Sequence, residues 1–192
     1  MTTQTSTLVE YRRRLAANRL GLWLFILSDT FVFGGLYVSR FYLLGTQERP
    51  EVSQLLGFVV TAILLLSSFF MNRAETAMAH GDRKTFLRGT LTTLVLGVIF
   101  LVGVVGVEWQ FAPFGPGDGA AASIFYTMTG FHAFHVLTGV IFLAVVYRNG
   151  RKGLYSPERH WAVEACAVYW HFVDVVWIFF YPALYLIGMP AL

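Results

Sequence analysis

The sequence has little charge and almost no cysteine. Of its 192 residues, 13% are Asp, Glu, Lys or Arg, whereas 56% are hydrophobic and 17% are aromatic. A water-soluble domain of this length needs a more polar surface, so the composition excludes an ordinary soluble fold. The single cysteine, Cys166, excludes an internal disulfide framework. The sequence also shows no convincing internal repeat, low-complexity segment or long linker, which argues against an inverted-repeat transporter.

The hydrophobic residues gather in five runs, each long enough to cross a membrane. A helix needs about 20 apolar residues to span a hydrocarbon core of about 30 Å. The connecting segments are short, contain Gly and Pro, and leave no room for a soluble domain. We therefore predict an all-α polytopic membrane bundle over residues 20–188, between an N-terminal polar segment, 1–19, and a tail, 189–192. The five transmembrane helices are expected at about 20–44, 52–79, 86–112, 122–147 and 161–187.

The basic residues lie mostly on one side of the predicted bundle. The opposite side has only Arg40 and Arg49, in its first loop. Because cytoplasmic loops retain positive charge, we predict a cytoplasmic N-terminus and an external C-terminus. The pI of about 9.2 then reflects dispersed loop charges and gives no indication of nucleic acid binding. The basic residues predicted to be cytoplasmic are Arg12, Arg13, Arg14, Arg19, Arg83, Lys84, Arg88, Arg148, Arg151, Lys152 and Arg159.

Ionisable side chains inside the predicted spans need a partner or a cavity, because charge is costly in lipid. Asp29 lies about nine residues into the first span, which at about 1.5 Å per residue places it near mid-membrane. Two roles explain it equally well: a hydrogen bond that keeps neighbouring helices in register, or a proton-active carboxyl group. Glu75 and Glu108 lie nearer the ends of their spans, where a carboxylate is less costly.

The fourth span carries two histidines, His132 and His135, three residues apart on one helical face. We favour interhelical hydrogen bonds or lipid contacts for them over haem or metal ligation. A pair on one helix cannot clamp a haem from both of its faces. A metal held together with Glu108 or Asp174 has only the spacing in its favour.

The fifth span carries a polar stripe of its own. Glu164, His171 and Asp174 follow one another at spacings of seven and three residues, so we expect them on one face that is buried in protein. In the third span, Gly97, Gly103 and Gly106 indicate close helix approach. The aromatic residues expected to form belts at the membrane interfaces are Trp23, Trp109, Trp161 and Tyr185.

The fifth span also resembles a known family. Residues 169–177 read Tyr-Trp-His-Phe-Val-Asp-Val-Val-Trp and closely resemble the last helix of subunit III of haem-copper cytochrome oxidases. The resemblance covers roughly residues 20–188, and members of the family commonly have seven helices. The chain is similar to the short bacterial form, which lacks the first two. Further segments that resemble the family, in the same order, are 24–29, 81–84, 108–109 and 129–136.

The resemblance implies a non-catalytic core subunit of a proton-pumping terminal oxidase in a bacterial inner membrane. Such a subunit packs directly against subunit I, alongside subunit II and any further respiratory-complex subunits, and leaves haem and copper to those partners. It is expected to hold structural phospholipid and to support proton uptake by subunit I and the durability of subunit I. The implied polar candidates for lipid or helix-interface contacts are Glu75, Glu108, His132, His135, His160, Glu164, His171 and Asp174.

Asp29 matches the acidic residue that the family carries in this helix. Cytochrome c oxidases usually have Glu there, whereas some quinol-oxidising members have Asp, so the electron donor stays open. Two other classes compete with this reading of the sequence. One is a small proton-coupled transporter that uses Asp29 and His171, and the other is a membrane cytochrome with histidine haem ligands. Without the resemblance, the residues support only a helical bundle with buried protonatable groups.

Overall fold

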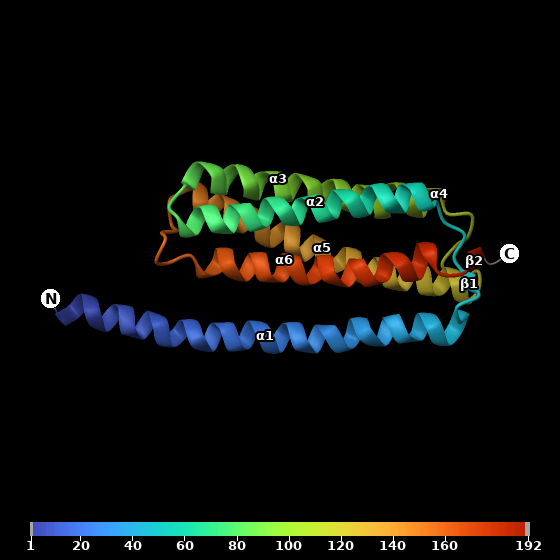
Figure 1. The fold of residues 1–192 in the computed structure, drawn as a ribbon, viewed down its shortest axis with the longest axis horizontal. Coiled ribbons are helices and arrows are strands. Elements are labelled where there is room, and N and C mark those ends of the chain that lie inside the picture. The colour runs from blue at the N-terminus through green and yellow to red at the C-terminus, as the bar shows by residue number, and fades with distance from the viewer. Residues whose placement is uncertain (1, 191–192) are drawn as a thin grey trace.

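The computed structural model describes residues 2–190, with the side chains from Glu10 onward except that of Arg12. Five helices in this part of the chain are long and apolar enough to cross a membrane, which confirms the predicted fold class. They run side by side in alternating directions (Figure 1). The rest of the predicted tail, residues 191 and 192, lies outside the described residues. The five candidate spans are Arg13–Leu44, Gln54–Ala79, Arg83–Phe111, Ala120–Arg151 and Trp161–Leu186.

Two of the five spans change helix type along their length. The third span continues from an α-helix into a π-helix and a short α-helical turn, and the fifth ends in a second π-helix. In chain order the elements are α1 (Thr2–Leu44), β1 (Glu48–Arg49), α2 (Gln54–Ala79), α3 (Arg83–Leu101), η1 (Val102–Glu108), α4 (Trp109–Phe111), α5 (Ala120–Arg151), α6 (Trp161–Tyr181), η2 (Pro182–Leu186) and β2 (Met189–Pro190).

The two ends of the bundle differ in charge. The N-terminus, the α2–α3 turn and the α5–α6 connection lie together at one end, which we call the basic end (Figure 1). The other end, here called the C-terminal end, holds the α1–α2 and α4–α5 connections. There β1 pairs in parallel with β2, with Glu48 opposite Met189, so residues 189–190 are joined to the first loop. The structure thus brings the charged loops together as the sequence predicts.

Helix α1 begins at Thr2, far ahead of the apolar run that starts at Leu20. The predicted polar segment 1–19 contains neither Gly nor Pro, so nothing in it interrupts a helix. Glu10 and Arg14, one turn apart, form an ion pair of 2.5 Å on its surface. The segment is therefore a polar extension of the first transmembrane helix.

The turn between α2 and α3 depends on Gly81 and Asp82. Gly81 adopts a φ of +79°, a conformation that strongly favours glycine. The Asp82 carboxylate accepts hydrogen bonds from the Thr85 hydroxyl (2.6 Å) and backbone N–H (3.1 Å), and so caps the start of α3. These hydrogen bonds hold the pKa of Asp82 below its usual value.

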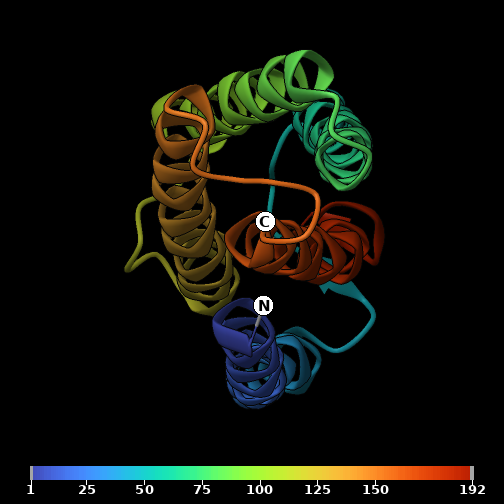
Figure 2. The same ribbon diagram turned by 90° about the vertical axis from the view of Figure 1, so that its left-hand side faces the viewer.

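Helix α6 occupies the centre of the bundle, with α1, α5 and α2 around it (Figure 2). Helix α3 packs mainly on α2 and α5, whereas α1 lies mainly against the edge formed by α5 and α6. In the most apolar 18-residue stretch of the span, 11% of the residues in α1 are buried, whereas 61% are buried in the corresponding stretch of α6 and η2. Most of the apolar surface of α1, including Phe31 and Tyr42, is therefore exposed in the single chain.

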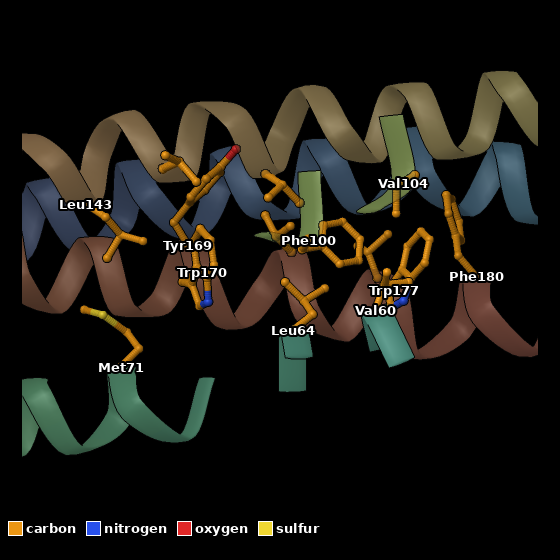
Figure 3. Packing of buried hydrophobic residues seen from close by; sticks show 14 of the residues in the cluster. Val60, Leu64, Met71, Phe100, Val104, Leu143, Tyr169, Trp170, Trp177 and Phe180 are labelled. Atoms are coloured by element: carbon orange, nitrogen blue, oxygen red, sulfur yellow. The ribbon is translucent and has the colours of Figure 1, made fainter. Parts of the chain in front are cut away.

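The core is built around large aromatic side chains of α6 (Figure 3). Trp170 is 1% exposed, and its indole N–H donates to Ser67 of α2 over 2.9 Å. A Cβ atom added at Gly97 of α3 would lie 2.5 Å from the Trp170 ring, and one added at Gly139 of α5 would lie 2.9 Å from it. Glycine at Gly97 therefore allows the close approach that the sequence predicts.

The two π-helices lie near the C-terminal end and were not predicted. Pro182 begins η2, and its missing N–H is compatible with a break in the α-helical pattern there. A π-helical turn contains an extra residue and so changes which side chains face inward after it. Glu108, the last residue of η1, and Tyr185 of η2 both point into the core and meet there.

Candidate functional site: polar contacts inside the bundle

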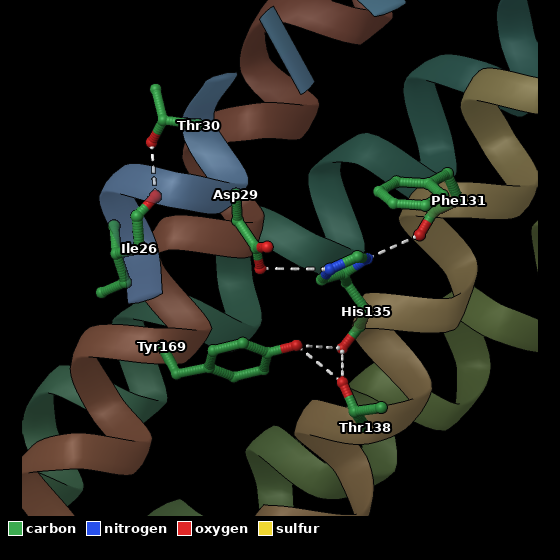
Figure 4. A network of polar contacts seen from close by, with 7 residues as sticks. All are labelled: Ile26, Asp29, Thr30, Phe131, His135, Thr138 and Tyr169. Carbon is green, nitrogen blue, oxygen red and sulfur yellow. Dashed lines mark hydrogen bonds and ion pairs between the residues drawn. The ribbon is translucent and has the colours of Figure 1, made fainter. Parts of the chain in front are cut away.

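The carboxylate of Asp29 on α1 contacts the ring of His135 on α5. The distance from Asp29 Oδ2 to His135 Nε2 is 3.3 Å, and the two side chains are 17% and 8% exposed (Figure 4). On its other side the ring uses Nδ1 to bond the Phe131 carbonyl one turn earlier, over 2.8 Å. The pair thus joins the outermost helix to the body of the bundle.

The geometry of His135 fixes where its hydrogens lie. A carbonyl oxygen only accepts, so Nδ1 must carry the hydrogen that it donates to Phe131. Nε2 then faces Asp29 Oδ2 over 3.3 Å, and this oxygen is buried without a hydrogen bond among the described residues, so the contact is a close approach of the two groups and not an aligned hydrogen bond.

The Asp29–His135 pair lines a largely apolar cavity of about 530 Å³ between α1, α5 and α6. The ring of Phe33 packs edge-on against His135 at a centroid distance of 4.8 Å. Below the pair, the Tyr169 hydroxyl donates to the His135 carbonyl and bonds the Thr138 hydroxyl over 2.6 Å. The pair is therefore held in position next to a largely apolar space.

His132 does not share the surroundings of His135. It is completely buried, and its Nε2 donates to the Val173 carbonyl of α6 over 3.0 Å. Its ring lies against Trp177 and Phe100, with centroid distances of 4.7 and 5.6 Å. The predicted interhelical hydrogen bond is thus present for this histidine, although the two rings serve different partners.

A second mid-membrane cluster joins α2 and α6. The Ser68 hydroxyl donates to Asp174 Oδ2 and lies 3.0 Å from His171 Nδ1, which donates to it when that nitrogen carries the hydrogen. Asp174 is 3% exposed, and its Oδ1 has no partner among the described residues. Ser68 was missed in the sequence, because a serine on an apolar helix gives no signal until its neighbour is known.

Glu164 lies apart from His171 and Asp174, so the predicted stripe is divided between two places. At the basic end, Glu164 accepts from Arg19 of α1 over 2.8 Å and lies 3.4 Å from His160. Glu75 of α2 is half-buried and has no ion pair among the described residues. The contacts of Glu164 link the basic ends of α1 and α6.

Glu108 is more buried than its place near the end of a span indicates. It is 3% exposed, and its Oε2 accepts a hydrogen bond of 2.7 Å from the Tyr185 hydroxyl. A Cβ atom at Gly57 of α2 would lie 2.5 Å from the Tyr185 ring, so only glycine leaves room for it. Tyr185 is fully buried, and its predicted place in an interface belt was wrong.

Comparison with known proteins decides among the classes considered from the sequence. The family model for cytochrome c oxidase subunit III matches residues 12–189. The chain belongs to the cytochrome c oxidase subunit III family. It is 36% identical over 174 residues to the cytochrome c oxidase subunit 3 of Thermostichus vulcanus, an alignment that covers 88% of this chain and 86% of the relative. Identity to the Oncorhynchus mykiss and Equus caballus subunits is 37% and 34% over 180 residues, covering 87% of this chain and 68% of each relative.

The subunit III match confirms the family predicted from residues 169–177 and the other matching segments. Those segments supply both residues of the Asp29–His135 contact and one residue of the Ser68–Asp174 contact. Asp29 comes from the segment in α1, His132 and His135 from the one in α5, and Asp174 from the one in α6. Among residues 2–190, no three metal-ligating side chains come close enough to form a common site.

Within this subunit III fold, Arg40 requires a correction. The sequence analysis placed it in a loop, but it lies in the last turns of α1 and is completely buried. Its guanidinium donates to four backbone carbonyls and has no acidic partner among the described residues. The sequence did contain a signal for this burial, because an arginine inside a predicted span needs bonding partners within the protein. The accepting residues and distances are Ala183 (2.6 Å), Gly45 (2.6 Å), Glu48 (2.8 Å) and Ile187 (2.8 Å).

Proposed function

We propose that this chain is a non-catalytic core subunit of a proton-pumping haem-copper oxidase, that it packs directly against subunit I, and that its Asp29–His135 pair supports proton uptake by subunit I. Membership of the subunit III family carries the proposal. The exposed apolar surface of α1 supports it, since a helix so little covered by its own chain has room for a partner subunit or for lipid.

In this proposal the haem and copper of the oxidase belong to partner subunits. The histidines described above already have partners within the chain: His132 bonds Val173, His135 bonds Phe131, and His171 contacts Ser68. Structural phospholipid is the ligand proposed for the chain itself. The largely apolar cavity of about 530 Å³ beside Asp29 supports this proposal, because its aromatic lining suits an acyl chain.

The proposed orientation in a bacterial inner membrane puts the basic end in the cytoplasm, where positive juxtamembrane residues are retained. Asp29, near the middle of α1, is then within the membrane at the depth where proton-active carboxyl groups require a specific partner. We take cytochrome c as the electron donor of the complex, because the relatives are named for it. Asp29 is the feature in favour of quinol as the electron donor, because cytochrome c oxidases usually have Glu at this position.

Purification of the tagged chain from its native membrane tests the subunit assignment. We expect larger subunits and their haem absorbance to co-purify, and both to leave together when the complex is dissociated. A haem that stays with this chain after the other subunits are removed would contradict the proposal. Proton-coupled transport by the chain alone in liposomes would favour the carrier class.

Substitution Asp29→Asn tests the role of the pair in the assembled oxidase. Because asparagine cannot exchange a proton with His135, turnover should slow or the enzyme should inactivate sooner, while assembly stays intact. The loss should be well below the roughly hundredfold effect of removing a direct acid–base catalyst, since the pair acts through subunit I. Oxygen consumption over a pH series, with inactivation followed during turnover, measures both effects.

Asp29→Glu is the matched control, because it keeps a carboxyl group at this position and should retain activity. His135→Gln should resemble Asp29→Asn, and the double variant should be no worse than either single one if the two residues act as a unit. Equal activity of all variants at every pH would leave the pair with a packing role only.

A further inference from the structure

A cavity at the C-terminal end is lined by two carboxylates that the proposed function does not use. It has a volume of about 340 Å³ and lies between the segment leading into α2 and the end of the third span. Glu51 and Ser53 line one wall, and Glu108 with the chain at Ala112 lines the other. We call it the acidic cavity. It is far along the bundle from the Asp29–His135 pair.

Glu108, which lines this cavity, has one carboxyl oxygen without a partner among the described residues. The residue is 3% exposed, and while Oε2 accepts from the Tyr185 hydroxyl, Oε1 is buried without a partner among the described residues. A buried carboxylate oxygen without a hydrogen bond is costly, and nearly all such groups in proteins have one. A cation or a hydrogen-bond donor in the cavity would satisfy it.

The basic residues at this end do not neutralise the two carboxylates. Arg40 directs its guanidinium to four carbonyls, and Arg49 bonds the neighbouring Pro50 carbonyl over 3.2 Å. Neither Glu51 nor Glu108 has an ion pair with any described side chain. The start of α2 adds only about half a positive charge to this wall. When both are ionised, the two carboxylates outweigh it and attract a cation.

We propose that the acidic cavity binds a divalent cation of the calcium class, with the carboxylates of Glu51 and Glu108 as ligands. The polar side chains of the lining offer only oxygens: two carboxylates and the Ser53 hydroxyl, which also accepts the Leu56 N–H that caps α2. Oxygen-only sets favour Ca²⁺ or Mg²⁺ over zinc or copper, and a roomy, open site suits the flexible coordination of Ca²⁺ better than the strict octahedron of Mg²⁺. Water completes the coordination shell.

A cation here would link two parts of the chain that are distant in the sequence. Glu51 precedes α2, whereas Glu108 ends η1 and is bonded to Tyr185 of η2. Binding would therefore stabilise the C-terminal end, which the proposed orientation puts outside the cell. Because a cation binds only the folded arrangement, it should raise the temperature of unfolding.

Calorimetric titration of Ca²⁺ into the purified, chelator-treated full chain in detergent tests the proposal. We expect one saturable site with a dissociation constant in the roughly 10⁻⁴–10⁻³ M range of open external sites. Glu51→Gln and Glu108→Gln should each weaken binding roughly ten- to a hundredfold, the effect seen even for groups that only support a metal ligand. The Ca²⁺-dependent rise in unfolding temperature should shrink in parallel.

Glu48→Gln is the control, since Glu48 lies three residues from Glu51 but outside the cavity lining. Its affinity should equal that of the wild type. Glu51 is exposed, so its variant folds and carries the test even if Glu108→Gln is unstable. Tyr185→Phe should keep or strengthen binding, because it frees Oε2. The proposal is wrong if the wild type shows no saturable Ca²⁺ binding, if Glu48→Gln weakens it equally, or if Mg²⁺ binds as tightly.

Discussion

Arg40→Leu should destabilise the chain by at least about 3 kcal/mol, the scale for removing one partner of a buried charged interaction. The substitution removes four hydrogen bonds and leaves their carbonyl acceptors in an apolar environment. Those acceptors belong to α1's own end, to β1 and to the η2 region, so the connection between the first loop and the C-terminus is lost. Thermal unfolding of the purified chain in detergent, followed by circular dichroism, measures the effect.

Arg40→Lys should recover only part of this stability. A single ammonium group cannot reach acceptors that the planar guanidinium contacts from three nitrogens. Arg49→Leu provides the control: Arg49 lies at the same end and makes one bond, to the Pro50 carbonyl, so stability should change by about 0.5 kcal/mol or less. A similar loss in both leucine variants would show that general charge, rather than the four contacts of Arg40, stabilises this end.

Gly97→Ala should destabilise the bundle by about 1–3 kcal/mol, the usual effect of overpacking a core. The new Cβ would lie 2.5 Å from the ring of Trp170, which cannot turn aside because Gly139 and Ser67 hold it on other sides. Helix α3 must then move away from α6. Chemical or thermal unfolding of the purified chain measures the loss.

Gly21→Ala is the matched control for this substitution. No atom lies within 4 Å of a Cβ at Gly21, so the change should be neutral or stabilising by up to about 1 kcal/mol, the helix propensity difference. Trp170→Phe should lessen the damage in the double variant with Gly97→Ala, because a smaller ring makes room. Additive losses in the double variant would contradict direct contact as the cause.

The spans were predictable because they depend on local properties of the chain. Runs of apolar residues of sufficient length, separated by short polar connections, specify helices that cross a membrane whatever their neighbours are. The start of α1 was the exception: the apolar run begins at Leu20, but the helix continues back to Thr2. Hydrophobicity marks where the membrane begins, whereas helix formation depends on propensity and the absence of Gly and Pro.

The polar residues were predictable as a set, but their partners were not. Because ionisable side chains are costly in lipid, Asp29, His135 and Asp174 were expected to need contacts. The structure provides contacts for all three. Spacing on one helix did not reveal that His132 and His135 serve different neighbours, nor that Glu164 lies apart from His171. Those outcomes depend on how neighbouring helices are rotated and on what they place opposite each residue.

The sequence by itself determined the five membrane-crossing helices, the common side of the basic loops and, through residues 169–177, the family. Only the tertiary structure decided that Asp29 meets His135, that Arg40 holds the C-terminal end together, and that Glu108 and Tyr185 meet in the core. Periodicity and composition are local quantities that each segment carries alone. A contact between side chains on different helices depends on packing, and here small features such as Gly97 and the two π-helices set it.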